Sequence, residues 1–156
     1  MTGSSTPERY VKPGWFTTHV FNRLVQVFIT MGVSVWGSRM LWVRGRRSGQ
    51  WRSNPVNLLS YNGEHYLVAP RGVTQWVRNL RAAGSGELRV GRKIQHFDAS
   101  ELDDAQKIDV LRAYLRRWKA EVGIYFDGVS ATSSVADLER IAPHHPVFRL
   151  TLCEAR

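Results

Sequence analysis

The sequence predicts an α+β protein with a mainly antiparallel sheet or barrel and helices on its outside. Three observations lead to this fold class. Short β-branched and aromatic runs follow one another between turn residues, a short helical stretch interrupts them, and longer helical stretches flank them. The length of 156 residues suits one domain with a substantial core.

Composition and charge narrow the class of protein further. A hydrophobic content of 43% with 22% charged residues is that of a folded chain, not of a disordered one. The single cysteine, Cys153, excludes an internal disulfide and a cysteine-rich metal site. The net charge of +9 favours an acidic partner, which charge alone leaves open between nucleic acid, an anionic membrane face and an anionic small molecule.

The N-terminal part of the chain divides into a tail and a helix. Residues 1–14 are mostly small and polar, and we expect a flexible tail. From Trp15 to Met31 apolar residues recur at helical spacing, which predicts an amphipathic helix that packs either on the sheet or in a membrane interface. The uncharged stretch between Arg23 and Arg39 is shorter than the ~20 residues of a membrane span.

An arginine-rich stretch, residues 42–55, separates two predicted strands, 40–43 and 56–61. It contains four arginines and two glycines. Glycines let a loop turn successive backbone N–H groups inward, and guanidinium groups form bidentate hydrogen bonds with phosphate and carboxylate oxygens. The stretch therefore predicts a site for a polyanion, with a solvated basic hairpin tip as the alternative.

A second anion-binding stretch is predicted after the next hairpin. Asn62-Gly63 is the dipeptide of a two-residue type I′ turn, so the run 65–69 should pair antiparallel with the strand before it. Pro70-Arg71-Gly72 then ends the strand, and Thr74 can cap a helix that reaches Ala83. Backbone N–H groups at such a helix start favour an anion.

The remainder of the chain predicts three strands and two helices. In order these are strands through 88–90 and 94–97, a helix from Asp103 to near Gly123, a loop at 127–134, a helix at 135–141 and a strand at 147–152.

Common catalytic motifs are missing from the sequence. It has no P-loop, no dinucleotide-binding glycine fingerprint after a strand and no His-Glu-x-x-His helix. Ser48 and Ser53 lack an evident His–Asp pair, which argues against a hydrolase triad. His144 and His145 are adjacent, and no carboxylate or cysteine ligand accompanies them, so we expect no metal site.

Taken together, the two anion-binding stretches resemble the deazaflavin-dependent nitroreductase family, the coenzyme F(420)-dependent split β-barrel oxidoreductases of actinobacteria. The resemblance is carried by Gly45-Arg46-Arg47-Ser48-Gly49, Arg52, Asn54-Pro55, Val68-Ala69-Pro70-Arg71-Gly72 and Trp76-x-x-Asn79-Leu80-x-Ala82.

This resemblance implies one FMN-binding-like split β-barrel domain over residues 15–156 that binds coenzyme F(420), with FMN as the less favoured cofactor. By position in the family motif, Arg46, Arg47, Ser48, Gly49 and Arg52 would hold the phosphate and glutamate tail. Ala69, Arg71, Gly72, Trp76 and Asn79 would line the ribityl and ring region, and Asn54 and Pro70 also belong to the implied site.

The reaction implied is hydride transfer from the reduced deazaflavin to a quinone, enone, nitro or lipid-derived acceptor. The sequence departs from the family pattern where Pro70 replaces a usual serine, which removes a hydroxyl and an N–H near the ring, and where the loop before Trp76 is shorter. The substrate-lining tyrosines have no clear counterpart, and the nearest candidates for catalysis are Tyr125, Ser133 and Ser134.

Two further expectations concern partners and location. We expect a cytoplasmic protein, with the N-terminal helix as a peripheral contact to the inner face of the membrane, and no nucleic-acid partner, because most aromatic residues occupy periodic positions typical of a core. A non-enzymatic module for an anionic membrane or nucleic acid is the alternative from another class.

Overall fold

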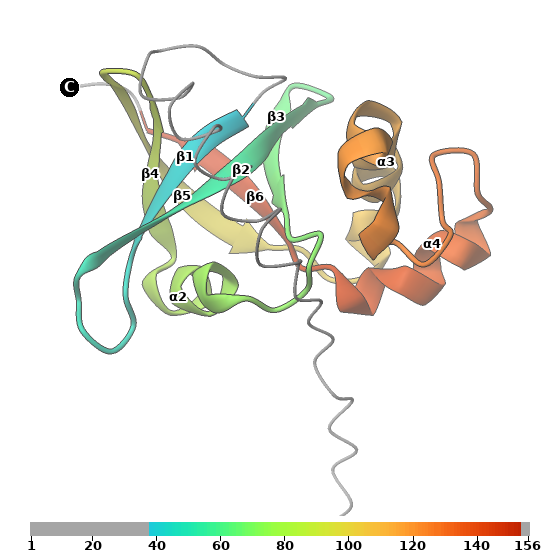
Figure 1. Ribbon diagram of the computed structural model, residues 1–156, viewed down its shortest axis with the longest axis horizontal. Coiled ribbons are helices and arrows are strands. Elements are labelled where there is room, and N and C mark those ends of the chain that lie inside the picture. The colour runs from blue at the N-terminus through green and yellow to red at the C-terminus, as the bar shows by residue number, and fades with distance from the viewer. Residues whose placement is uncertain (1–37, 154–156) are drawn as a thin grey trace, which may run out of the picture.

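Six antiparallel strands form a closed barrel with helices on its outside (Figure 1), in a computed structural model that describes residues 38–153. Around the barrel the order is β1-β2-β3-β6-β5-β4, and β4 pairs back to β1. The predicted antiparallel α+β fold is therefore confirmed. The strands are β1 (Ser38–Arg44), β2 (Trp51–Tyr61), β3 (Glu64–Val68), β4 (Ser85–Val90), β5 (Lys93–Glu101) and β6 (Val147–Leu152).

The helices form two groups. One helix, α2 (Gln75–Ala83), crosses the lower end of the barrel in Figure 1, and the others lie together against its right side. That second group comprises α3 (Ile108–Val122), α4 (Val135–Ile141) and the 3₁₀ turns η1 (Ala105–Lys107), η2 (Gly123–Tyr125) and η3 (Ala142–His144). The predicted tail 1–14 and the predicted helix 15–31 lie outside the described residues.

Strand β2 begins at Trp51, five residues before the predicted start at Val56, so much of the arginine-rich stretch is strand rather than loop. The register explains why polar residues and a proline are tolerated there. Residues 51–57 pair with β1, whereas among the described residues the pairing of β2 with β3 covers only Leu58–Tyr61. Pro55 lies in the singly paired part, where a residue without an N–H breaks no second ladder.

The β2–β3 connection is the two-residue turn that Asn62-Gly63 predicts. Asn62 has φ 55° and Gly63 has φ 80°, the left-handed values that a type I′ turn requires. The turn sets Tyr61 opposite Glu64, and the register puts Leu58 opposite Leu67. Alternate residues of both strands consequently face the barrel interior.

Two hydrophobic cores give the molecule its layers. The barrel interior is filled by side chains such as Leu41, Leu67 and Phe97, and Leu80 of α2 closes its end. Between the outer face of the sheet and α3–α4 lies a second core, whose buried residues include Leu59, Tyr66, Val68, Leu111, Tyr114, Leu115, Trp118, Phe126, Leu138 and Ile141. Because both faces of the β3 region are buried, the residues that follow this strand are held firmly.

Helix α2 agrees with the prediction in extent but differs in detail. Thr74 is its N-cap residue, yet the threonine hydroxyl makes no capping hydrogen bond. Val77, Asn79 and Leu80 form its buried face, and Ala83 is exposed. Near its C-terminal end, Arg81 makes a bidentate ion pair with Glu101 of β5, with N–O distances of 2.8 Å and 2.8 Å. This pair fixes the helix across the end of the barrel.

Helix α3 starts later than predicted because a 3₁₀ turn precedes it, and it ends as predicted before Gly123. Trp118 departs from helical geometry at φ −124° and ψ 17°, while its ring is fully buried. In the part of the chain described here, no helix combines the length and apolarity needed to cross a membrane.

Candidate cofactor site

The loop between β1 and β2, residues 45–50, is a compact turn that we call the arginine turn. The Gly45 N–H donates to Gln50 O at 2.7 Å, and the Gly49 N–H donates to Gly45 O at 2.9 Å. Gly49 has φ 71°, a left-handed conformation that favours glycine. The Ser48 hydroxyl accepts a hydrogen bond from the Gln50 N–H at 3.2 Å, so it helps to close the turn.

Arg46 joins the arginine turn to helix α2. Its backbone N–H and its Nη1 both donate to Asn79 Oδ1, at 3.1 Å and 2.9 Å, and Nη1 also donates to Gln75 Oε1 at 2.9 Å. Asn79 is only 5% exposed, so its amide is a fixed acceptor under an otherwise exposed turn. The two sequence stretches predicted to bind an anion are thus brought together by direct hydrogen bonds.

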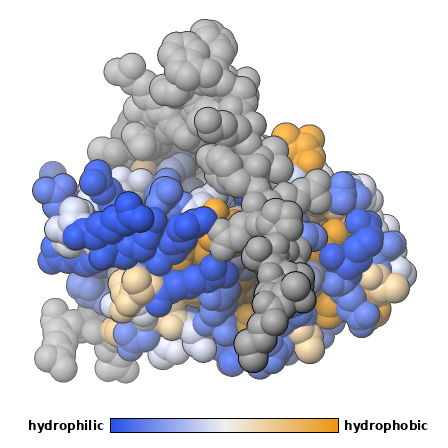
Figure 2. Space-filling view, turned by 90° about the horizontal axis from the view of Figure 1, so that it is seen from below, coloured by the Kyte–Doolittle hydropathy of each residue, from blue (hydrophilic) through white to orange (hydrophobic). Residues whose placement is uncertain are grey.

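The other arginines of the hairpin remain at the surface. Arg44 lies over the Trp51 ring at 4.3 Å from its centroid and donates from Nη1 to Gly49 O at 3.0 Å. Arg47 and Arg52 are exposed, and Arg52 lies on β2 opposite Val43. Seen from below, the side of the molecule that carries the hairpin and α2 is strongly hydrophilic (Figure 2), as expected for a surface that collects guanidinium groups.

Residues 69–74, which connect β3 to α2, form a second turn that we call the proline turn. The Ala69 N–H donates to Pro146 O at 2.9 Å, and the Gly72 N–H donates back to Ala69 O at 3.2 Å. Gly72 has φ 86° and is buried, which suits a residue without a side chain. The start of this turn is therefore fixed to the segment that precedes β6.

The outer part of the proline turn is more accessible. Pro70 and Arg71 are half-buried, and the Thr74 hydroxyl oxygen is buried without a hydrogen-bond partner among the described residues. Trp76, in the first turn of α2, is half-buried with its ring centroid 6.1 Å from that of Phe148. Trp76 thus packs on the barrel core and keeps part of its ring at the surface.

Asn54, the remaining residue of the implied cofactor site, is half-buried on β2 opposite Leu41. It lies on the same strand as Arg52, two residues farther from the arginine turn. Strand alternation puts both side chains on the same face of β2 as the interior residue Val56.

The three candidates for catalysis lie in the other helical group. Ser133 Oγ accepts from the Ser130 N–H at 2.8 Å, and Ser134 Oγ accepts from the Asp137 N–H at 3.2 Å as the N-cap of α4. Tyr125 is half-buried against the outer core. The barrel separates these residues from the arginine turn, and the proline turn lies between the two regions (Figure 1).

Two residues that were not predicted as part of the site, Gln75 and His145, contact the turns. Gln75 precedes Asn79 by four positions on α2, so helical spacing could have indicated that both face the same neighbour. His145 Nδ1 lies 3.3 Å from Ala69 O, a contact between residues far apart in the chain that no local pattern announces.

Titratable groups with shifted pKa values lie outside both turns. Burial, and then the hydrogen bond to Glu64, raises the pKa of Tyr66 on β3. Burial, and then the charge of Arg117, lowers the pKa of Arg39 on β1. Over residues 38–153, no three His, Cys, Asp or Glu side chains gather closely enough to hold a metal ion.

A model of the F420H(2)-dependent quinone reductase family matches residues 17–136, which is most of the chain. The chain belongs to this family. It is accordingly an oxidoreductase, and the predicted resemblance to coenzyme F(420)-dependent reductases is confirmed. None of the curated proteins matches it.

Solved structures share the fold of this quinone reductase family member at low sequence identity. A structure described as an F420-H2 dependent reductase is 19% identical, with 74% of this chain and 94% of that chain covered and a TM-score of 0.51. A structure described as a domain-swapped dimer is also 19% identical. The match covers 87% of this chain and 97% of that chain, with a TM-score of 0.52. An Agrobacterium tumefaciens protein of unknown function is 12% identical. The match covers 92% of this chain and 60% of that chain, with a TM-score of 0.51.

Proposed function

We propose that this chain binds coenzyme F(420) across the arginine and proline turns and reduces a small electrophilic acceptor: a quinone, an enone, a nitro compound or a lipid-derived compound. The observation that carries the proposal is the link from Arg46 to Asn79 and Gln75, since it makes the two turns neighbours. One elongated ligand with several negative charges can then contact both.

The donors at these turns suit such a ligand. Arg47 and Arg52 offer exposed guanidinium groups that bind phosphate and carboxylate oxygens in a bidentate manner. At the start of α2 the backbone N–H groups of the first turn have no partner within the helix, and they favour negative charge. The hydroxyl of Thr74, which lacks a partner among the described residues, lies at the same helix end.

When bound, the reduced coenzyme supplies the hydride from its deazaflavin ring. The residues of this chain bind and orient it. Arg46, Arg47, Ser48, Gly49 and Arg52 would hold the phosphate and tail. The proline turn and the half-buried Trp76 would contact the ribityl and ring region, and Asn79 would act through Arg46. Tyr125, Ser133 and Ser134 would be the candidates for contact with the acceptor.

A titration of the purified protein with coenzyme F(420), followed by coenzyme fluorescence, tests the cofactor assignment. The double variant Arg47→Ala and Arg52→Ala should bind at least about tenfold more weakly, because charge-assisted hydrogen bonds are lost. Arg46 is best left unchanged, since it also fixes the turn.

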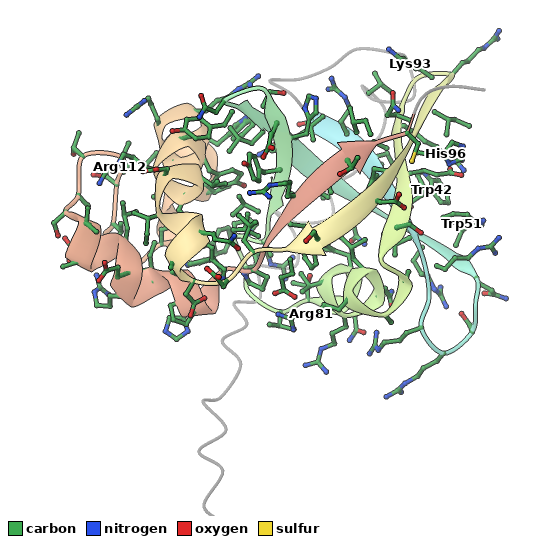
Figure 3. All side chains as sticks on the ribbon, turned by 180° about the vertical axis from the view of Figure 1, so that it is seen from behind. Trp42, Trp51, Arg81, Lys93, His96 and Arg112 are labelled. Carbon is green, nitrogen blue, oxygen red and sulfur yellow. The ribbon has the colours of Figure 1, made fainter. Side chains whose placement is uncertain are left out.

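Lys93→Ala is the matched control for charge. Lys93 is exposed at the opposite end of the barrel from α2 (Figure 3), so affinity should stay within about twofold of the native value. Failure of the native protein to bind the coenzyme would refute the proposal. So would an equal loss of affinity in the control and the double variant.

FMN is the competing cofactor, and the same titration decides between the two. FMN carries one phosphate, whereas the hairpin presents Arg44, Arg46, Arg47 and Arg52. We therefore expect FMN to bind more weakly and to lose less affinity in the double variant. Tighter binding of FMN than of coenzyme F(420) would reverse the assignment.

We also propose a cytoplasmic location with peripheral contact to the inner face of the membrane. The support is the amphipathic pattern of residues 15–31 together with the net charge of +9. The intact protein should sediment with phosphatidylglycerol vesicles but not with phosphatidylcholine vesicles. Replacing Phe21 and Phe28 with serine should abolish this binding, and unchanged sedimentation would refute the proposed contact.

A further inference from the structure

His145 lies at the junction between the proline turn and the α3–α4 layer, and no step proposed above uses it. It is 3% exposed. Its ring stacks on Phe126 of the outer core, with centroids 4.2 Å apart and planes inclined by 19°. Its Nδ1 lies 3.3 Å from the carbonyl oxygen of Ala69, the first residue of the proline turn.

The backbone around His145 explains why its ring reaches this position. Pro146 follows it, and a residue before proline is confined to extended conformations, as its φ of −128° and ψ of 92° show. Its own N–H donates to Ala142 O at 3.2 Å, which ties it to the end of η3. Pro146 O in turn accepts the Ala69 N–H at 2.9 Å.

Ala69 is consequently held on both of its backbone groups by two consecutive residues, His145 and Pro146. A carbonyl oxygen only accepts hydrogen bonds, so Nδ1 must carry the proton in this contact. The same carbonyl also accepts the Gly72 N–H at 3.2 Å. The orientation of the Ala69 carbonyl thus sets the path of the turn that follows.

We propose that His145 is a positioning residue for cofactor binding: through its Nδ1–H it orients the Ala69 carbonyl and so fixes the proline turn in the shape that receives the ribityl and ring region. This inference rests on the proposed function. It also assigns a role to Phe126, whose ring supports the imidazole from the outer core.

Two substitutions separate the hydrogen bond from the ring. His145→Phe keeps an aromatic ring against Phe126 and loses the donor. His145→Asn keeps a side-chain N–H near the position of Nδ1 and loses the stacking. If the donor matters, His145→Phe should weaken coenzyme F(420) binding about five- to tenfold, the value of one buried hydrogen bond. His145→Asn should stay within about twofold of the native affinity.

His144→Phe is the matched control, because it makes the same change at the neighbouring, half-buried histidine of η3. It should leave the affinity unchanged. The proposal fails if His145→Phe binds as tightly as the native protein. It also fails if His145→Asn loses as much affinity as His145→Phe, since a side-chain donor at this position would then not restore binding.

Amide hydrogen exchange of the protein without coenzyme gives an independent readout. The Ala69 and Gly72 amides should exchange faster in His145→Phe than in the native protein and in His144→Phe, because the turn is released locally. Unchanged exchange at both amides would overturn the positioning role. If the native protein instead fails to bind the coenzyme, the proposed function falls, while exchange still decides whether His145 fixes the turn.

Discussion

The arginine turn and the proline turn adjoin the same helix, α2, yet they are held in opposite ways. The arginine turn is exposed and is fixed from one side, through the buried amide of Asn79. The proline turn begins at a buried residue, Ala69, whose N–H and carbonyl are both held by the segment before β6. Burying an unpaired charge is costly, so these guanidinium groups favour the surface, whereas backbone donors can be set rigidly against a core.

This difference indicates a division of labour. The arginine turn supplies charge and tolerates some movement, because long side chains adapt to a flexible anionic tail. The proline turn supplies shape, and shape requires the packing that surrounds β3. Substitutions that act on one turn and not on the other can therefore test the comparison.

The largest effect is expected for Asn79→Leu. Removing the buried acceptor releases Arg46, so the free energy of unfolding should fall by about 1–3 kcal/mol and coenzyme affinity by at least about tenfold. Asn79→Asp keeps both acceptor contacts and should retain the native melting temperature. Thermal unfolding and fluorescence titration measure the two effects. If Asn79→Leu binds the coenzyme with native affinity, the hydrogen bonds from Arg46 to Asn79 are not needed to hold the arginine turn for binding.

A smaller effect is expected for Arg47→Ala, about three- to tenfold in coenzyme affinity with an unchanged melting temperature, because the side chain is exposed. Added salt should reduce the difference between the native protein and this variant, since exposed charges are screened over about 8–10 Å at physiological ionic strength. Titrations at low and high salt measure this. A difference that is independent of salt would contradict an electrostatic role.

Gly49→Ala should have a weaker effect, and Gly63→Ala in the β2–β3 turn is its matched control. Both glycines have left-handed φ values, 71° and 80°, and an added Cβ would meet no atom within 4 Å at either position. Each substitution should therefore cost about 1–2 kcal/mol of stability through backbone strain alone. Coenzyme affinity should fall about two- to threefold only in Gly49→Ala. If Gly49→Ala and Gly63→Ala bind the coenzyme with equal affinity, the conformation of the arginine turn does not contribute to binding.

The smallest effect concerns Tyr66, on the strand that leads into the proline turn. Burial, and then the hydrogen bond to Glu64, raises its pKa in the folded state. Its stabilising contribution is therefore complete below the unfolded pKa of about 10 and is lost as pH rises through the folded pKa. Chemical unfolding at pH 8 and pH 11 should show a smaller loss of stability in Tyr66→Phe than in the native protein. An equal loss in both would exclude Tyr66 as the group responsible.

The secondary-structure elements that local sequence patterns specify were predicted correctly. The Asn62-Gly63 turn, helix α4, strand β6 and the end of α3 at Gly123 all lie where the sequence places them. The start of β2 was predicted too late, because polar residues and Pro55 resemble a loop unless the one-sided pairing with β1 is known.

The sequence by itself determined where the chain turns, which faces are apolar and that two of its stretches suit an anion. These properties depend on φ preferences and on spacings of a few residues, so they can be read without the fold. Only the tertiary structure decided that Arg46 meets Asn79, 33 positions away, and that His145 meets Ala69, 76 positions away. Closure of the barrel creates these contacts, because pairing between distant strands sets which turns become neighbours.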